Sequence, residues 1–247
     1  MKQTNIFEYY AFGYNYGLIR RNGLYNYEIK EATTMLKEFF ESIDELDLEV
    51  TNQVSEKLRE ILEELPKNKE DIISQELSAK IEHEIERIDI ALDAELKLKE
   101  AFQLTDKRYP LKKLIEEPKK LLAKGVFDNL NDHSKRDFHL ACVQIALSLP
   151  TGAAFHLMRT LEEQVKVLYF HYKKTKRLNK PMWGPMIQQL RSKRNPKPSA
   201  KLLDLLDSIR LHYRNPTQHP DLFYTIDEAQ DLLNQTISAI NLINSEI

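Results

Sequence analysis

The sequence predicts an all-α protein, and three observations support this fold class. Leu, Glu, Lys and Ile, which favour helices, are abundant, whereas only 6 of the 247 residues are Gly. Apolar residues recur at spacings of three and four along most of the chain. Prolines and capping residues stand between these runs. The hydrophobic content of 42% is enough to bury a sizeable core in one or two domains.

The first 25 residues are rich in Tyr and Phe, and their pattern fits either a short helix or two short strands. We expect this aromatic cluster to serve packing rather than to form a ligand cage. Residues 26 to 105 have a helical pattern, interrupted by a probable break at residues 65 to 71. The run that follows the break carries one apolar stripe, made of Ile73, Leu77, Ile81, Ile85, Ile88 and Leu92.

Residues 38 to 100 are strongly acidic, with 20 acidic and 8 basic side chains. We expect a short antiparallel helical arm or bundle whose acidity argues against nucleic-acid binding there. A solvated bundle face explains the charges, although the same pattern also fits self-association. Two prolines and Gly125 in residues 106 to 125 suggest a domain boundary, so we expect an N-terminal region of residues 1–125 and a C-terminal domain of residues 126–247.

The C-terminal domain has the pattern of a bundle of four or five helices. Ser134 is a candidate N-cap for its first helix, and Pro150 and Gly152 suggest a break after that helix. Thr225 and Glu228 form a capping box that sets the start of the last helix. The inward-facing stripes are Ala154, Met158, Leu161, Val165 and Leu168 in the second helix, Leu202, Leu205, Leu206 and Ile209 in a later one, and Ile226, Ala229, Leu233, Ile237 and Ile240 in the last.

A basic segment at residues 164 to 203 contains eleven Lys and Arg and no acidic residue, in a chain whose formal net charge is only -2. Such a segment is typical of proteins that bind polyanions, because Lys and Arg release counterions from phosphates. The interleaved aromatic residues could stack on unpaired bases; they are Tyr169, His171, Tyr172 and Trp183. A loop that balances the acidic arm is the simpler alternative. The RNA-binding candidates are Lys173, Lys174, Lys176, Arg177, Lys180, Arg191, Lys193 and Arg194.

Several classes of protein are disfavoured by what the sequence lacks. Cys142 is the single cysteine, so an internal disulfide is impossible and a reducing cytoplasm is the simplest setting. The sequence shows no signal-peptide pattern and no apolar run long enough to span a bilayer, so we expect a soluble protein without a membrane partner. Neither a metal-ligand spacing nor a Gly-rich phosphate loop is present, and we expect no cofactor and no metal.

The stretch YRNPTQHPD, which begins at Tyr213, carries the residues best suited to chemistry. Pro216 cannot lie inside the preceding helix, and Asn215 before it should leave helical geometry. We therefore expect Arg214 at a helix end and His219 in a proline-stiffened connector. Histidine can donate or accept a proton near neutral pH, and a guanidinium offsets the charge that builds on a pentavalent phosphorus. This pair would suit RNA cleavage by attack of the 2'-hydroxyl, with Asn215 adding a neutral hydrogen bond.

An Arg followed by four residues and a His, with a polar residue directly after the Arg, resembles the signature of HEPN domains. These are small helical bundles, and many are metal-independent endoribonucleases of toxin–antitoxin and other defence systems. The segment AAFHLMRTLEEQVKVLY is similar to an early HEPN helix, and DLLDSIRLHYRNPTQHPDLFYTIDEAQDLLNQTISAINLI to the last two. The resemblance covers about residues 130 to 247.

The resemblance implies that Arg214 and His219 are the catalytic pair and that Asn215 is a polar helper. Glu162 or Glu163, with Arg159, could support them from the early helix, although Arg159 and Glu163 also fit an ordinary surface pair at i, i+4.

One HEPN motif offers a single histidine, whereas the reaction needs an acid and a base. The resemblance therefore implies a homodimer with a composite active site. HEPN toxins that are paired with a nucleotidyltransferase often have Tyr two residues after the His, but this chain has Asp221 there. We expect no control through modification of that tyrosine.

The function that these expectations favour is a metal-independent HEPN endoribonuclease, acting on RNA in a bacterial defence or toxin role under a regulatory protein partner. The alternative is a non-catalytic HEPN module that binds a nucleotide, RNA or a protein. A purely structural helical adaptor is a third possibility. His156 and His212 lie on helices that flank the motif and could line its cleft, but we expect packing or surface roles for both.

Overall fold

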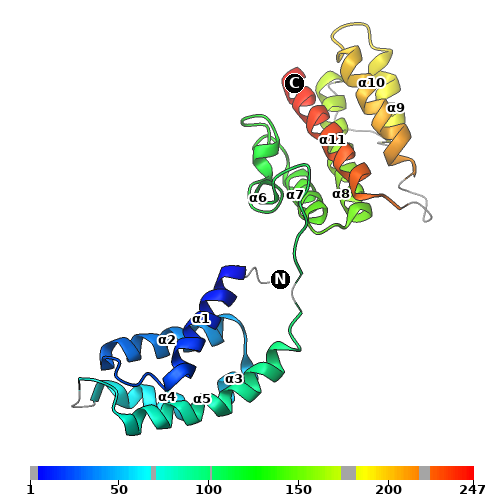
Figure 1. The fold of residues 1–247 in the computed structure, drawn as a ribbon. Helices are drawn as coiled ribbons and strands as arrows, with labels where there is room; N and C mark the ends of the chain where they lie inside the picture. The colour runs from blue at the N-terminus through cyan, green and yellow to red at the C-terminus, as the bar shows by residue number, and fades with distance from the viewer. Residues whose placement is uncertain (1–4, 68–70, 101, 174–181, 217–222) are drawn as a thin grey trace. The chain divides into compact units, whose positions relative to one another are not determined.

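The protein is all-helical in the computed structural model, which describes residues 5–67, 71–100, 102–173, 182–216 and 223–247 (Figure 1). Over these ranges every named element is a helix, and the pairing of Glu28 with Ile72 is an isolated antiparallel bridge. The chain divides into two compact units, Met1–Phe102 and Gln103–Ile247. The predicted all-α fold class is confirmed. No helix in these ranges has both the length and the apolarity to cross a membrane.

The N-terminal unit is a bundle in which α1 and α3 both pack against the long helix α5. Its helices are α1 (Ile6–Asn22), α2 (Ile29–Glu45), α3 (Glu49–Val54), α4 (Glu56–Glu64), the 3-10 turn η1 (Leu65–Lys67) and α5 (Gln75–Leu96). The pattern of the first 25 residues fitted either a short helix or two short strands, and the structure has a helix there, α1. Asn5 and Glu8 form a capping box at its start, a signal that the sequence contained.

Aromatic residues on one side of α1 build the core of this unit. The rings of Phe12 and Tyr16 stack on Phe39 of α2, with centroids 5.7 and 6.0 Å apart. The hydroxyl of Tyr16 donates to Asp89 of α5 at 2.6 Å, and Arg20 forms an ion pair with the same carboxylate. The expected packing role of the aromatic cluster thus holds for these residues, whereas the outer side of α1 remains exposed.

The C-terminal unit begins earlier than the predicted boundary at residue 125. Leu114 and Leu122 are buried in its core, and the backbone N–H of Arg108 donates to Gln230 at 2.7 Å. The proline-containing segment therefore belongs to this unit, because its few apolar side chains are buried there. The elements are α6 (Leu111–Ile115), the 3-10 turn η2 (Pro118–Leu121), α7 (Asp132–Ala146), α8 (Pro150–Lys173), α9 (Trp183–Arg191), α10 (Ala200–Ile209), the π-helical turn η3 (Arg210–Arg214) and α11 (Ile226–Glu246).

Helix α8 is the centre of the C-terminal unit, with α7, α9 and α11 packed around it. All five residues of its predicted stripe are buried. The stripes of α10 and α11 also face the core, although Leu205, Ile226 and Ile237 are only partly buried.

Two predicted helix boundaries in this unit are wrong. Asn131, not Ser134, is the N-cap of α7: its side chain accepts from the backbone N–H of Ser134 at 2.8 Å. Helix α8 begins at Pro150 and includes Gly152, so the break precedes Pro150. A proline at the first helical position has no N–H to leave unsatisfied, which is why it starts this helix rather than interrupting it.

Candidate functional site

Arg214 ends a single π-helical turn that continues α10. The turn spans Arg210–Arg214, and the backbone N–H of Asn215 donates to the carbonyl oxygen of Arg210 at 3.0 Å. Leu206 and Ile209 anchor the preceding turn in the core. Single π-turns of this kind recur at functional sites because they re-aim side chains that a regular helix would place elsewhere.

The predicted departure of Asn215 from helical geometry is wrong. Its dihedral angles, φ -66° and ψ -48°, are those of a right-handed helix. A residue before proline is usually pushed out of this region by the proline ring. Here the wide turn keeps a hydrogen bond between Asn215 and Arg210, and that bond offsets the steric cost.

The guanidinium of Arg214 lies against α8. Its Nη2 atom is 3.8 Å from the Oε2 atom of Glu162, and both side chains are more than two-thirds buried. At this distance the two groups attract each other in a partly dehydrated environment, where charges interact more strongly than in water. Glu162, one of the two glutamates proposed as supports, thus contacts Arg214, while its role in a reaction stays a prediction.

Two tyrosines hold together the two ends of the connector, which is the segment between η3 and α11. The ring of Tyr213 stacks on that of Tyr224 with centroids 6.2 Å apart, and the Tyr224 hydroxyl donates to the Tyr213 carbonyl oxygen at 3.1 Å. The backbone N–H of Tyr224 also donates to Thr151, at the start of α8. The capping box of Thr225 and Glu228 then starts α11, as predicted. Tyr213 and Tyr224, which stand before and after residues 217–222, thus lie side by side on the bundle.

A buried carboxylate on α7 binds two basic residues of α8. Asp137 accepts a hydrogen bond from His156 Nδ1 at 2.8 Å and pairs with Arg159 Nε at 3.0 Å. Arg159 is thereby held one helical turn from Glu162. The alternative pairing of Arg159 with Glu163 is wrong, because Glu163 pairs with Lys166 at 2.5 Å.

The basic segment is partly neutralised by α10. Arg191 lies 2.7 Å from a carboxylate oxygen of Asp204 and 3.9 Å from one of Asp207. Its side chain is therefore a structural link between α9 and α10 as well as an RNA-binding candidate. Arg194 is exposed, and Lys193 and Lys173 are half-buried.

The aromatic residues of the basic segment are mostly structural. Tyr169 and Trp183 are buried in the core, and the Tyr169 hydroxyl donates to Gln189 at 2.6 Å. Tyr172 is half-buried and donates to the carbonyl oxygen of Glu246. The expectation that this set stacks on unpaired bases is wrong for Tyr169 and Trp183, because α8 and α9 turn both residues inward. His171 is exposed.

Several candidates lie outside the residues that the structure describes. These are His219, Asp221 and the RNA-binding candidates Lys174, Lys176, Arg177 and Lys180. The described part of the site is therefore Arg214, Asn215 and Glu162.

Sequence reasoning missed Asp137 and the pair of tyrosines that joins the connector ends. One signal was present for Asp137: it stands beside Phe138 and four residues before Ala141, on the side of α7 that is buried. An acidic residue on an apolar face usually has a buried partner. No local signal pointed to the contact between Tyr213 and Tyr224, because it depends on how α10 and α11 pack against each other.

Comparison with protein-family models, with curated proteins and with solved structures found no match to this chain in any of the three.

Proposed function

We propose that the C-terminal unit is a metal-independent endoribonuclease of the HEPN type. The observation that carries the proposal is the placement of Arg214: a guanidinium that is more than two-thirds buried at the end of a π-turn, beside Glu162 and at the start of the connector that contains His219. A guanidinium fixed in this way suits the stabilisation of the negative charge that builds on the phosphoryl oxygens in the transition state.

The reaction needs three contributions. His219 takes the proton from a 2'-hydroxyl, whose oxygen attacks the neighbouring phosphorus. Arg214 donates hydrogen bonds to the non-bridging oxygens, on which negative charge builds, and Asn215 adds a neutral hydrogen bond. The bond to the 5'-oxygen breaks, and that oxygen receives a proton from His219 of the partner subunit. The products are a 2',3'-cyclic phosphate and a 5'-hydroxyl.

The requirement for an acid and a base is the reason for proposing a homodimer with a composite active site. One copy supplies a single HEPN motif, so two motifs that face each other across a two-fold axis complete the set. A protein that stays monomeric with and without RNA, yet cleaves at full rate, would contradict this part of the proposal.

The biological role that we propose is that of a bacterial defence or toxin effector in the cytoplasm, controlled by a protein partner. Arg194, Lys193 and Lys173 give the described part of the RNA path, and an exposed charge binds phosphate by releasing counterions.

The test is cleavage of total RNA in EDTA by wild type and by Arg214→Ala and His219→Ala. We expect cleavage that both substitutions abolish, with 2',3'-cyclic phosphate ends on the fragments. Matched controls are Arg136→Ala and His139→Ala, which remove exposed side chains of the same types from α7. Equal cleavage by wild type and both site variants would sink the proposal. Tight RNA or nucleotide binding without cleavage would favour a binding module instead.

A further inference from the structure

An exposed aromatic ring of the C-terminal unit lies on the same side of α8 as the contact between Glu162 and Arg214. Phe155 exposes 53% of its surface, although the other large apolar residues of this helix are mostly buried. Phe155, Arg159 and Glu162 stand four and three residues apart, so they follow one another along one side of the helix. Phe155 is therefore about two helical turns, or roughly 10 Å, from Glu162.

The guanidinium of Arg159 lies beside this ring. Its Cζ atom is 5.9 Å from the centroid of the Phe155 ring, a distance at which a cation and an aromatic face attract each other. Asp137 on α7 fixes the guanidinium through Nε at 3.0 Å, and its side chain is only 7% exposed. Among the residues that the structure describes, Asp137 is the only carboxylate paired with Arg159. The Arg159 side chain is 53% exposed, so its amino groups face the surface next to the ring.

We propose that Phe155 and Arg159 form a base-binding subsite, in which one unpaired RNA base stacks on the exposed ring and accepts hydrogen bonds from the Arg159 amino groups. Aromatic rings and guanidinium planes are the surfaces on which splayed bases stack. The inference rests on the proposed function, because it places this base next to the phosphate that Arg214 contacts. The subsite takes the stacking role that Tyr169 and Trp183 cannot fill, since both are buried.

The polar surroundings of the ring favour a base over an apolar side chain of a protein partner. The ring of His156 meets that of Phe155 edge to face, with centroids 6.2 Å apart, and the Arg159 guanidinium is equally near. A protein partner that covered the ring with aliphatic side chains would also remove water from this guanidinium, which costs free energy. A base covers the ring with its flat face and still offers acceptors at its edge to the guanidinium.

A second exposed ring stands at the same end of α8. Phe223 exposes 79% of its surface and directly precedes Tyr224. The backbone N–H of Tyr224 donates to the Thr151 hydroxyl at 3.1 Å, and Thr151 is four residues before Phe155 on the same side of α8. The exposed aromatic residues of the site thus lie on the side of Phe155 that is farther from Glu162, where a strand bound at Arg214 continues.

Binding of an oligonucleotide by Phe155 variants tests the subsite apart from catalysis. The probe is a fluorescent oligouridylate, and the full-length protein carries His219→Ala, so that the RNA stays intact if the chain is a ribonuclease. Phe155→Leu keeps an apolar side chain but removes the ring, and it should weaken binding about tenfold. Phe155→Trp supplies another ring and should stay within about twofold of the starting affinity. The fluorescence of Trp183 in an unfolding curve shows that the Leu variant is folded.

Inorganic polyphosphate separates stacking on a base from attraction to phosphate, because it carries negative charge but no base. Phe155→Leu should leave the affinity for polyphosphate unchanged, whereas Arg194→Ala should weaken the binding of both probes. An equal loss of affinity for both probes in Phe155→Leu would overturn the proposal. Binding of oligouridylate that is absent, or that Phe155→Leu does not weaken, would overturn it as well.

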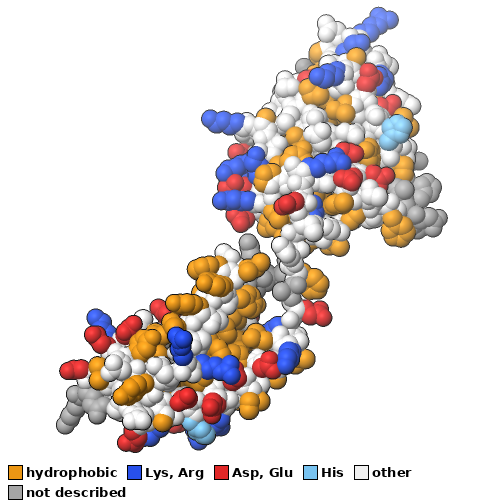
Figure 2. All heavy atoms as spheres, viewed as in Figure 1, with side chains coloured by type: hydrophobic (Ala, Val, Ile, Leu, Met, Phe, Trp, Pro, Cys, Tyr) orange, Lys and Arg blue, Asp and Glu red, His pale blue; other side chains and the backbone are white. Residues whose placement is uncertain are grey.

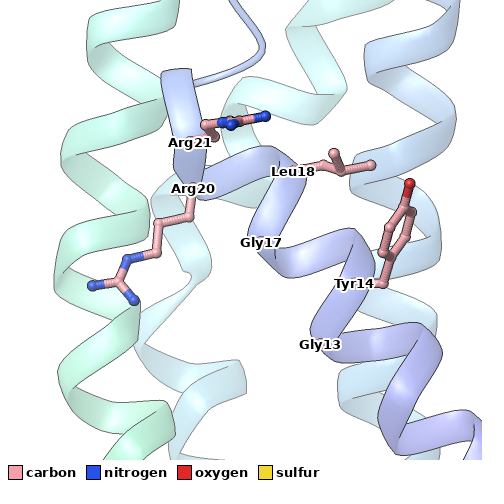
Figure 3. Close-up of a pocket in the computed structure, with 6 residues that line it drawn as sticks. All are labelled: Gly13, Tyr14, Gly17, Leu18, Arg20 and Arg21. Carbon is pink, nitrogen blue, oxygen red and sulfur yellow. The ribbon is translucent and has the colours of Figure 1, made fainter.

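Helix α1 offers a matched control, an exposed ring outside the subsite. Figure 2 shows hydrophobic side chains gathered over α1, and Tyr14 of this helix exposes 62% of its surface. Leu18 and Arg20 line the same shallow hollow, but Arg20 points away from Tyr14 (Figure 3) and pairs with Asp89. Tyr14→Leu should therefore leave oligouridylate binding unchanged. A loss equal to that of Phe155→Leu would contradict the assignment, because any exposed ring would then serve.

Ultraviolet cross-linking reports the contact directly. A uracil that stacks on an aromatic ring is held where irradiation can join the two, and mass spectrometry of the digested complex identifies the residue. We expect a uridine adduct on Phe155 that disappears in Phe155→Leu. Adducts confined to other residues would overturn the placement of the base.

The outcomes separate this inference from the proposed function. Oligouridylate binding that depends on Phe155, in a wild-type protein that does not cleave RNA, would support the subsite and contradict the ribonuclease. Cleavage that requires Arg214, together with binding that ignores Phe155, would contradict the subsite alone. In an active protein Phe155→Leu should raise KM about tenfold with little change in kcat, because the ring holds the base equally before and during the reaction.

Discussion

Arg214 and Glu162 lie 3.8 Å apart and link the π-turn after α10 to the middle of α8. The two residues are far apart in the sequence and lie on different elements, η3 and α8. The contact orients the guanidinium that we propose to act on the scissile phosphate. The effect of this contact on RNA cleavage can be measured, with Glu163 as a control.

Glu162→Gln should lower RNA cleavage by about tenfold, because a guanidinium that loses its charged partner is less well positioned. Glu162 is a positioning residue in the proposed reaction, so kcat should fall more than KM rises. Glu163→Gln is the matched control, since Glu163 pairs with Lys166 instead. Equal effects of both substitutions would show that the contact with Arg214 does not matter for the reaction.

The carboxylate of Asp137 should be a large contributor to the stability of the C-terminal unit. Asp137→Ala leaves His156 and Arg159 without their partner, and we expect a loss of about 3 kcal/mol in the free energy of unfolding. Thermal or urea unfolding followed by the fluorescence of Trp183, which is buried in this unit, measures the loss. Asp128→Ala, at an exposed position, should change stability by less than about 0.5 kcal/mol.

Arg194 should contribute more to RNA binding than Arg191, although the sequence analysis predicted both as RNA-binding residues. The charge of Arg191 is already offset by Asp204 on α10. Arg194→Ala should therefore reduce the slope of log affinity against log salt by about one unit, and Arg191→Ala by less. Titration of RNA at several salt concentrations distinguishes the two, and an equal change in slope would contradict the expectation.

Glu95 should make the stability of the N-terminal unit dependent on pH. Burial alone would raise the pKa of this carboxyl, but hydrogen bonds from the Thr51 hydroxyl and from the backbone N–H groups of Thr51 and Val50 lower it overall. Because the folded-state pKa is depressed, the stabilisation is complete above the unfolded pKa of about 4.3 and is lost as the pH falls through the folded value.

The matching substitution is Glu95→Gln, which should cost about 2 kcal/mol at pH 7 and progressively less below pH ~4.3. Hydrogen exchange of the α3 amide groups measures the effect in this unit. Glu86→Gln, at an exposed position of α5, should show no such dependence. A cost of Glu95→Gln that stays constant between pH 7 and pH 3 would contradict the assignment.

Gly23→Ala should destabilise the N-terminal unit by about 3 kcal/mol. Gly23 ends α1 in the left-handed region, with φ 53°, and an added Cβ would collide with the carbonyl oxygen of Ser78 in α5. Gly13→Ala is the control: it lies in the same helix with open space around it and should raise stability by up to about 1 kcal/mol. Thermal unfolding followed by hydrogen exchange in α1 compares the two.

Local features of the site were predicted well, whereas contacts between distant residues were not. The helix end at Arg214 and the start of α11 at Thr225 follow from proline sterics and from a capping box, which act over a few residues. The helical state of Asn215 was missed, because a π-turn depends on how α10 packs. The inward turn of Tyr169 and Trp183 was missed because charge counting does not show which way a side chain faces.

The sequence by itself determined that this chain is helical and which sides of its long helices are buried, because hydrogen bonding within a helix and apolar periodicity are local properties. Only the tertiary structure decided that Arg214 meets Glu162, that Asp137 binds two basic residues, and that Arg191 is neutralised. Such pairs join separate helices, so they are set by how the helices pack. The same holds for α1, whose two apolar sides look alike in sequence until packing buries one and leaves the other exposed.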